Sequence, residues 1–199
     1  MRMKSYENQV MIRKLSLQEM QEIYDRQMQE DFPPVEIKPF STIRLLHERG
    51  EYVGLGMLTK EGSILAYGFF VVCRPSGQAV LLDYFAVDKD RRGEGIGTHM
   101  LREIKEIYAD IPVLLESEDP DYACDEADRI KREKRIAFYH RNNALDTGVR
   151  VRVFDVEYAV LQLMRPGEKP KEDQAEKILD ELYRTMFRPD QLETKVQLL

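Results

Sequence analysis

The sequence has little cysteine. It contains two, Cys73 and Cys124, which lie far apart in 199 residues, and no C-x-x-C pair. This excludes a small disulfide-built scaffold and gives no sign of a zinc knuckle, so we expect no structural metal. Sparse cysteine is typical of proteins from a reducing compartment, and we expect a cytoplasmic protein.

Long apolar runs are missing as well. No stretch of about 18 apolar residues is present, so the sequence predicts no segment that spans a membrane. The first residues, MRMKSYENQ, hold no apolar core of a secretion signal. We therefore expect no membrane partner.

An excess of basic residues is also absent. The chain has 30 Lys and Arg against 36 Asp and Glu, for a formal net charge of −6. Nucleic-acid binding depends on basic side chains that neutralise phosphates, so we expect no nucleic-acid partner. A hydrophobic content of 43% and a length of 199 residues suit one globular domain with an appendage.

The stretch from residue 79 to 108 carries the strongest pattern. An apolar run, Ala79–Val87, predicts a buried strand, and a charged turn and a glycine-rich segment follow it. Apolar residues at helical spacing then predict a helix from Ile96 onward. The first backbone N–H groups of a helix have no internal partner and lie at the positive end of its dipole. A strand, a glycine-rich turn and a helix start in this order predict an anion site.

The alternation of Gly93, Gly95 and Gly97 separates this turn from other phosphate-binding loops. A dinucleotide-binding loop needs G-x-G-x-x-G in a parallel βαβ unit, and a Walker A loop ends in Gly-Lys-Ser/Thr; neither pattern is present. The spacing Arg92-x-x-Gly95-x-Gly97 closely resembles the acyl-CoA pyrophosphate loop of the GNAT superfamily of N-acyltransferases, Gln/Arg-x-x-Gly-x-Gly/Ala. The alternative is a tight turn that caps an ordinary helix.

The resemblance implies acetyl-CoA as cosubstrate. Its pyrophosphate would bind the backbone amides of the loop and Arg92, and its pantetheine would lie along the end of the preceding strand. A backbone N–H of Ala86 or Val87 would stabilise the oxyanion that develops on the thioester. The expected cofactor-binding residues are Phe85, Ala86, Val87, Arg91, Arg92, Gly93, Glu94, Gly95, Ile96, Gly97 and Thr98.

The remaining patterns predict an α+β fold. Ser16 and Glu19 predict a capping box at the start of the first helix, and Gly50 is expected to end the second helix. Pro75-Ser76-Gly77 predicts a turn. The order of elements is similar to the GNAT fold over about residues 9 to 165, with a mixed, largely antiparallel sheet flanked by helices. We expect strands at 10–15, 51–59, 63–73, 79–87, 111–115, 149–154 and 156–164, and helices at 17–30, 35–48, 96–108 and 125–141.

The tail lies beyond that fold. We expect a domain at 1–165 and, at 166–199, a linker followed by a helical C-terminal extension. Two interpretations of the apolar face of the extension stay open: it packs on the chain's own domain, or it is an arm of a homodimer. The face comprises Ala175, Ile178, Leu179, Leu182, Tyr183 and Met186.

A second family pattern lies near residue 140. The GNAT superfamily often carries Phe-Tyr-x-Arg-x-Gly-Phe, and Phe138, Tyr139 and Arg141 match it. Asn143 replaces the Gly, and Asn tolerates a left-handed helix cap. The resemblance implies that Tyr139 donates a proton to the departing CoA thiolate. The alternative is an interfacial Tyr that completes an amphipathic helix.

One position departs from that pattern. Arg132 stands where the family often has an Asn that contacts the cofactor. The family's Asn contact with the cofactor therefore does not carry over to this position.

The acceptor side is less specific. Seven acids lie between Glu116 and Asp128. We expect Glu116 to act as a direct or water-mediated base, with Glu118 and Phe32 as substrate-binding residues. The alternative is a solvated loop whose later acids cap the next helix.

These observations favour an N-acetyltransferase that moves an acetyl group from acetyl-CoA to the primary amine of a small molecule. The amine would attack the thioester directly. One rival is a CoA-binding regulatory or interaction module without catalysis. Another is a nucleotide-phosphate binder that merely shares a glycine-rich turn.

Overall fold

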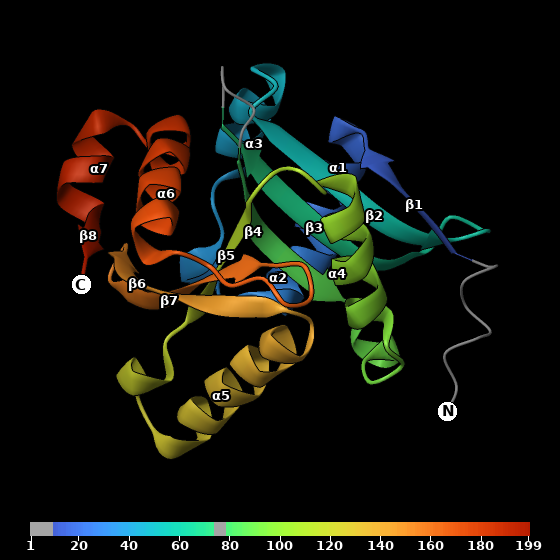
Figure 1. The fold of residues 1–199 in the computed structure, drawn as a ribbon. Helices are drawn as coiled ribbons and strands as arrows, with labels where there is room; N and C mark the ends of the chain where they lie inside the picture. Colours follow the sequence, from blue (N-terminus) through green and yellow to red (C-terminus); the bar gives the residue numbers. More distant parts are fainter. Residues whose placement is uncertain (1–9, 74–78) are drawn as a thin grey trace. The chain divides into compact units, whose positions relative to one another are not determined.

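The structure, a computed structural model, describes residues 10–73 and 79–199. The turn expected at Pro75-Ser76-Gly77 and the first nine residues lie outside this part. Figure 1 labels the elements of the chain, which divides into two compact units. Of the described residues, the first unit holds 10–72 and 83–103, and the second holds 73, 79–82 and 104–199.

The described residues form a mixed, largely antiparallel sheet with helices. Its eight strands follow the order β1-β2-β3-β4-β5-β7-β6-β8. The strands β4 (Val80–Val87) and β5 (Val113–Glu118) are parallel, with a ladder that joins Val80–Leu82 to Val113–Leu115. The pairs β1–β2, β2–β3, β5–β7, β6–β7 and β6–β8 are antiparallel. The predicted α+β class is confirmed.

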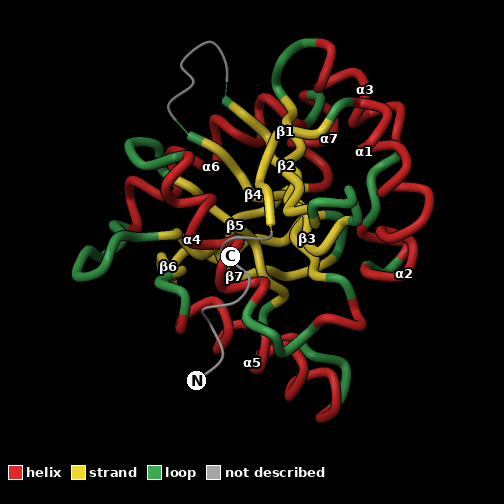
Figure 2. Tube along the Cα trace, turned by 90° about the vertical axis from the view of Figure 1, so that its right-hand side faces the viewer, coloured by secondary structure: helices red, strands yellow, loops and turns green. Residues whose placement is uncertain are grey.

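In the first unit, β1 (Val10–Leu15) pairs with β2 (Tyr52–Thr59), which pairs with β3 (Ile64–Val72). Helices α1 (Leu17–Ile23) and α3 (Phe40–Glu48) lie side by side (Figure 2). The core is built by side chains that are at most 2% exposed: Met20, Ile23, Met28, Ile43, Leu55, Met57, Phe69 and Phe70.

The helices of this unit confirm some expectations and correct others. The capping box of Ser16 and Glu19 forms as predicted, and Gly50, with φ 71, ends α3. The first predicted helix is interrupted by a π-helical turn before the short α2 (Gln29–Asp31). The second begins at Phe40 rather than residue 35, because Pro39 disfavours helical backbone at the residue before it.

In the second unit, β5 pairs with β7 (Val156–Leu163), which pairs with β6 (Ala144–Val153). Helices α5 (Glu126–Arg141) and α6 (Glu172–Met186) lie on opposite sides of β6 and β7 (Figure 1). The chain ends with α7 (Pro189–Lys195) and β8 (Val196–Leu198), and β8 pairs with β6.

Two strands of this unit are longer than predicted. The strand β5 runs to Glu118, so Glu116 and Glu118 lie within it and not in a loop after it. Their pairing with Val160 and Tyr158 of β7 outweighs the low strand propensity of Glu. The strand β6 begins at residue 144 and not at 149. The sequence did not reveal its first residues because a register irregularity between residues 146 and 150 breaks the apolar alternation that marks a strand.

The apolar face of the tail is covered within the chain. Helix α6 packs on β6, and Ala175, Leu179, Leu182 and Met186 of its stripe are buried. The interpretation as packing on the chain's own fold is therefore supported. None of the described helices combines the length and apolar character that crossing a bilayer requires.

Candidate active site

The expected site residues are divided between the two units. Phe32 and all the expected cofactor-binding residues, 85–87 and 91–98, belong to the first unit. Glu116, Glu118 and Tyr139 belong to the second. The helix α4 (Ile96–Ile107), which follows the glycine-rich loop (residues 91–98), and the strand β4 contribute residues to both units.

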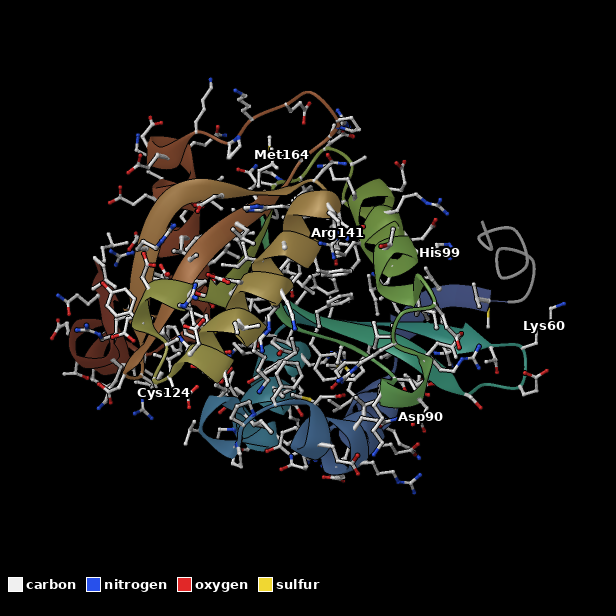
Figure 3. All side chains as sticks on the ribbon, turned by 90° about the horizontal axis from the view of Figure 1, so that it is seen from below. Lys60, Asp90, His99, Cys124, Arg141 and Met164 are labelled. Carbon is white, nitrogen blue, oxygen red and sulfur yellow. The ribbon has the colours of Figure 1, made fainter. Side chains whose placement is uncertain are left out.

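The glycine-rich loop has the backbone of an anion-binding turn. A 3₁₀ turn, Lys89–Arg91, follows β4, and Gly93 and Gly95 both have φ 85, a left-handed conformation that favours glycine. The helix α4 begins at Ile96, so the amides of its first turn have no intrahelical acceptor. Figure 3 shows Asp90 in the turn before this helix. The loop therefore offers backbone donors to an anion.

The basic side chains of the loop and of the turn before it are paired with acids of the first unit. Arg92 lies 2.9 Å from Asp31, which also accepts a hydrogen bond of 3.0 Å from Tyr67. Lys89 and Glu30 form an ion pair of 2.6 Å, and Arg91 pairs with Glu94 at 2.9 Å. Burial raises the pKa of Asp31 above its usual value, and the hydrogen bond from Tyr67 and the charge of Arg92 offset only part of this rise. These local pairs balance the positive charge of the loop side chains.

A buried network around Asp83 accompanies Phe32, in the same unit. Asp83 of β4 accepts hydrogen bonds from Lys38 at 2.6 Å and Tyr52 at 2.5 Å. The ring of Phe32 packs edge-on against Tyr84, with centroids 5.1 Å apart. Sequence reasoning missed this network, since Lys38 and Asp83 lie 45 positions apart and no local pattern joins them.

In the second unit, Tyr139 lies near the end of α5 and is 7% exposed. Burial raises the pKa of Tyr139 to about 12, although the charge of Arg135 lowers it. The phenol therefore holds its proton at neutral pH and can donate it. Asn143 has φ 59, which confirms the predicted left-handed turn after the helix.

Glu116 accepts a hydrogen bond from the hydroxyl group of Tyr183. Glu116 is half-buried on β5, and Tyr183, on α6, is 3% exposed. Tyr183 belongs to the predicted apolar stripe of the extension. Its sequence position gives no signal of a polar contact 67 residues away.

Five other acids near β5 have arginine partners or cap a helix: Glu118, Asp119, Asp125, Glu126 and Asp128. Glu118 lies 2.5 Å from Arg135 and 3.2 Å from Arg132. Arg132 also donates to the carbonyl oxygen of Asp119, so this position serves packing between α5 and the end of β5. The other contacts are Asp119 with Arg150, Asp128 with Arg132, Glu126 with Arg129, and the Asp125 cap on the amide of Asp128. The expectation that later acids cap the helix is confirmed at Asp125.

A sequence model of the Acetyltransferase (GNAT) family matches residues 17–121, which include the glycine-rich loop and β5. The match covers more than half of the chain. The chain belongs to this GNAT family. As a member, it is an acyl-CoA-dependent N-acetyltransferase, and its family uses acetyl-CoA.

Solved GNAT structures share the fold. A GNAT-family protein from Bacteroides thetaiotaomicron superposes with a TM-score of 0.65 at 18% identity, covering 87% of this chain and 96% of the other. Spermidine N-acetyltransferase from Vibrio cholerae, in complex with CoA and spermine, gives 0.54 at 10% identity, covering 78% and 95%. A dodecameric structure of that enzyme gives 0.56 at 8% identity, covering 79% and 94%. No curated protein matches the chain.

Proposed function

We propose that this GNAT protein transfers the acetyl group of acetyl-CoA to the primary amine of a small molecule. The amine attacks the thioester directly, without a covalent enzyme intermediate. The observation that carries the proposal is the glycine-rich loop, in which two left-handed glycines lead into the start of α4. Backbone donors at a helix start suit a pyrophosphate.

The loop residues fit this cosubstrate. The amides between Gly93 and Thr98 would hold the pyrophosphate, and Arg92 would add charge. The half-buried Phe85 and Val87 would line the pantetheine. Bound acetyl-CoA supplies the thioester carbonyl, and the N–H of Ala86 or Val87 would stabilise its oxyanion. The end of the β4–β5 ladder at Leu82 and Leu115 is compatible with this role.

Two side chains of the second unit would move protons. The acceptor amine must lose a proton to attack, and Glu116 would accept it directly or through a water molecule. As the C–N bond forms, the carbonyl π pair would move to oxygen; as the carbonyl forms again, the C–S bond would break. Tyr139 would protonate the leaving thiolate, whose thiol has a pKa of about 8.5 in water. A phenol with a pKa of about 12 keeps its proton at neutral pH and is a weaker acid than the thiol, so Tyr139 would first stabilise the developing thiolate as a hydrogen-bond donor.

We propose that the acceptor has one primary amine and no second cationic group. The Vibrio cholerae relative is described in complex with spermine, a polyamine. In this chain, Glu118 is held by Arg132 and Arg135, so it carries little spare negative charge for a polycation. We propose Phe32 and Glu118 as substrate-binding residues that contribute shape and hydrogen bonding.

Thermal unfolding with acetyl-CoA and thiol release with a panel of primary amines test the proposal together. We expect acetyl-CoA to raise the melting temperature, ATP to have a much smaller effect, and CoA release to depend on an added amine. Stabilisation without amine-dependent thiol release would favour the binding module. Equal stabilisation by ATP would favour a general phosphate binder, and no stabilisation at millimolar acetyl-CoA would refute the proposal.

A further inference from the structure

The C-terminal extension supplies a buried hydroxyl group to β5. Helix α6 presents its apolar stripe to the fold of the second unit, and Tyr183 is part of that stripe. Among the buried residues of this stripe, Tyr183 alone carries a polar side-chain group, and its hydroxyl donates to Glu116. Buried polar groups are placed where they have a partner, so this contact orients both side chains.

Tyr183 is held firmly by its surroundings. Its ring lies 5.5 Å from the ring of Phe187, which lies 5.8 Å from Phe154. The helix end is closed by a hydrogen bond of 2.7 Å from the amide of Phe187 to the carbonyl oxygen of Tyr183. A rigid, buried phenol has few alternative positions, so it can hold a carboxylate in one orientation.

The extension is anchored on both sides of this residue. Near its start, a Cβ built on Gly148 of β6 would lie 3.0 Å from the carboxylate of Glu172, so helix and strand approach closely. Beyond its end, β8 pairs with β6, and the amide of Leu199 donates to the carbonyl oxygen of Arg150 at 3.0 Å. The position of α6 relative to β6 is therefore fixed from two sides.

We propose that the C-terminal extension is part of the catalytic apparatus, with Tyr183 as the positioning residue that holds Glu116 in the orientation of a general base. The inference rests on the proposed function of Glu116. Tyr183 itself touches no reacting atom in this scheme and acts through the carboxylate. The extension thus contributes a residue from outside the expected GNAT domain at 1–165.

The test is the pH dependence of acetyl transfer in Tyr183→Phe, which keeps the ring and removes the hydroxyl. A hydrogen bond to a carboxylate favours its charged form, so its loss should move the acid limb of kcat/KM upward by roughly one pH unit. The KM for acetyl-CoA should stay unchanged. In the background of Glu116→Gln, Tyr183→Phe should add little. The matched control is Tyr122→Phe, at a position that is 47% exposed, and its profile should follow the wild type.

A second measurement needs no turnover. In the protein with ¹³C-labelled tyrosine, the ring signal of Tyr183 should shift with a titration that Glu116→Gln abolishes. A wild-type pH profile in Tyr183→Phe, or a Tyr183 signal without that titration, would overturn the inference. Wild-type protein that transfers acetyl to no amine would instead refute the proposed function and remove the base that Tyr183 positions. The titration would still show whether the contact exists.

Discussion

The glycine-rich loop and the acidic strand end (residues 116–119) differ in which part of the chain presents the chemistry. In the loop, backbone amides and two left-handed glycines do so, and the basic side chains are paired with acids nearby. In the strand end, side chains do so, and their partners come from other elements: Tyr183 from α6, Arg135 from α5 and Arg150 from β6. Backbone function follows from local spacing, whereas side-chain function here depends on residues distant in sequence.

Glu116→Gln should have the largest effect, and it tests whether a side chain of the strand end carries out the chemistry. If Glu116 is the base, kcat should fall on the order of 10³-fold at neutral pH, because the amide cannot accept the proton. Acetyl-CoA affinity should be unchanged, since the loop residues are intact. Stopped assays of kcat and calorimetry with acetyl-CoA measure the two effects. Glu126→Gln, in the same acidic stretch but paired with Arg129, serves as control. A near-normal kcat would remove Glu116 from the mechanism.

Tyr139→Phe should lower kcat on the order of 10²-fold, again without loss of acetyl-CoA affinity, because the thiolate loses its proton donor. Burial raises the pKa of Tyr139 to about 12, so the phenol keeps its proton and its ionisation causes no fall in rate between roughly pH 7 and 9. A pH–rate series of both proteins measures this. A kcat of Tyr139→Phe equal to that of the wild type would remove Tyr139 from the mechanism.

Gly95→Ala tests the loop through its backbone. A Cβ meets nothing within 4 Å at this position, so the cost comes from φ 85 alone. Strain of roughly 1–2 kcal/mol in the bound turn should weaken acetyl-CoA binding about tenfold and leave kcat at saturation unchanged. Gly62→Ala is a matched control in the same unit, with φ 90 and equally open space. Equal binding loss in both variants would show a stability effect.

Asp31→Asn should produce the smallest effect. It keeps a partner for Tyr67 but removes the charge that competes with phosphate for Arg92, so acetyl-CoA should bind roughly threefold more tightly at low salt. The gain should fade at high salt. Glu30→Gln, whose ion pair with Lys89 is exposed, should change affinity less. Weaker binding in Asp31→Asn would mean that Asp31 helps to orient Arg92 instead.

Much of the fold could be predicted because it follows from local periodicity. The capping box at Ser16, the strand Val10–Leu15 and the start of α4 at Ile96 agree with the predictions. Errors lie where tertiary pairing or proline decides. The strand β5 continues through Glu116 because β7 pairs with it, and α3 begins late because of Pro39.

In the candidate site, too, local features could be predicted from the sequence and long-range contacts could not. Gly93, Gly95 and the helix start at Ile96 are recognisable from spacing, and Asn143 takes the left-handed turn that its side chain tolerates. The contact of Tyr183 with Glu116 could not be predicted, since both residues fit their local patterns without it.

By itself, the sequence determined the order of the main elements as far as α6, the anion-binding turn and the Tyr-bearing helix, because periodicity, glycine spacing and helix-end chemistry act over a few residues. Only the tertiary structure decided the partners of the charged and hydroxyl groups. It joined Arg92 to Asp31, Glu118 to two arginines and Tyr183 to Glu116. Buried polar groups find such partners through folding, so their identity depends on which elements pack together and not on their spacing.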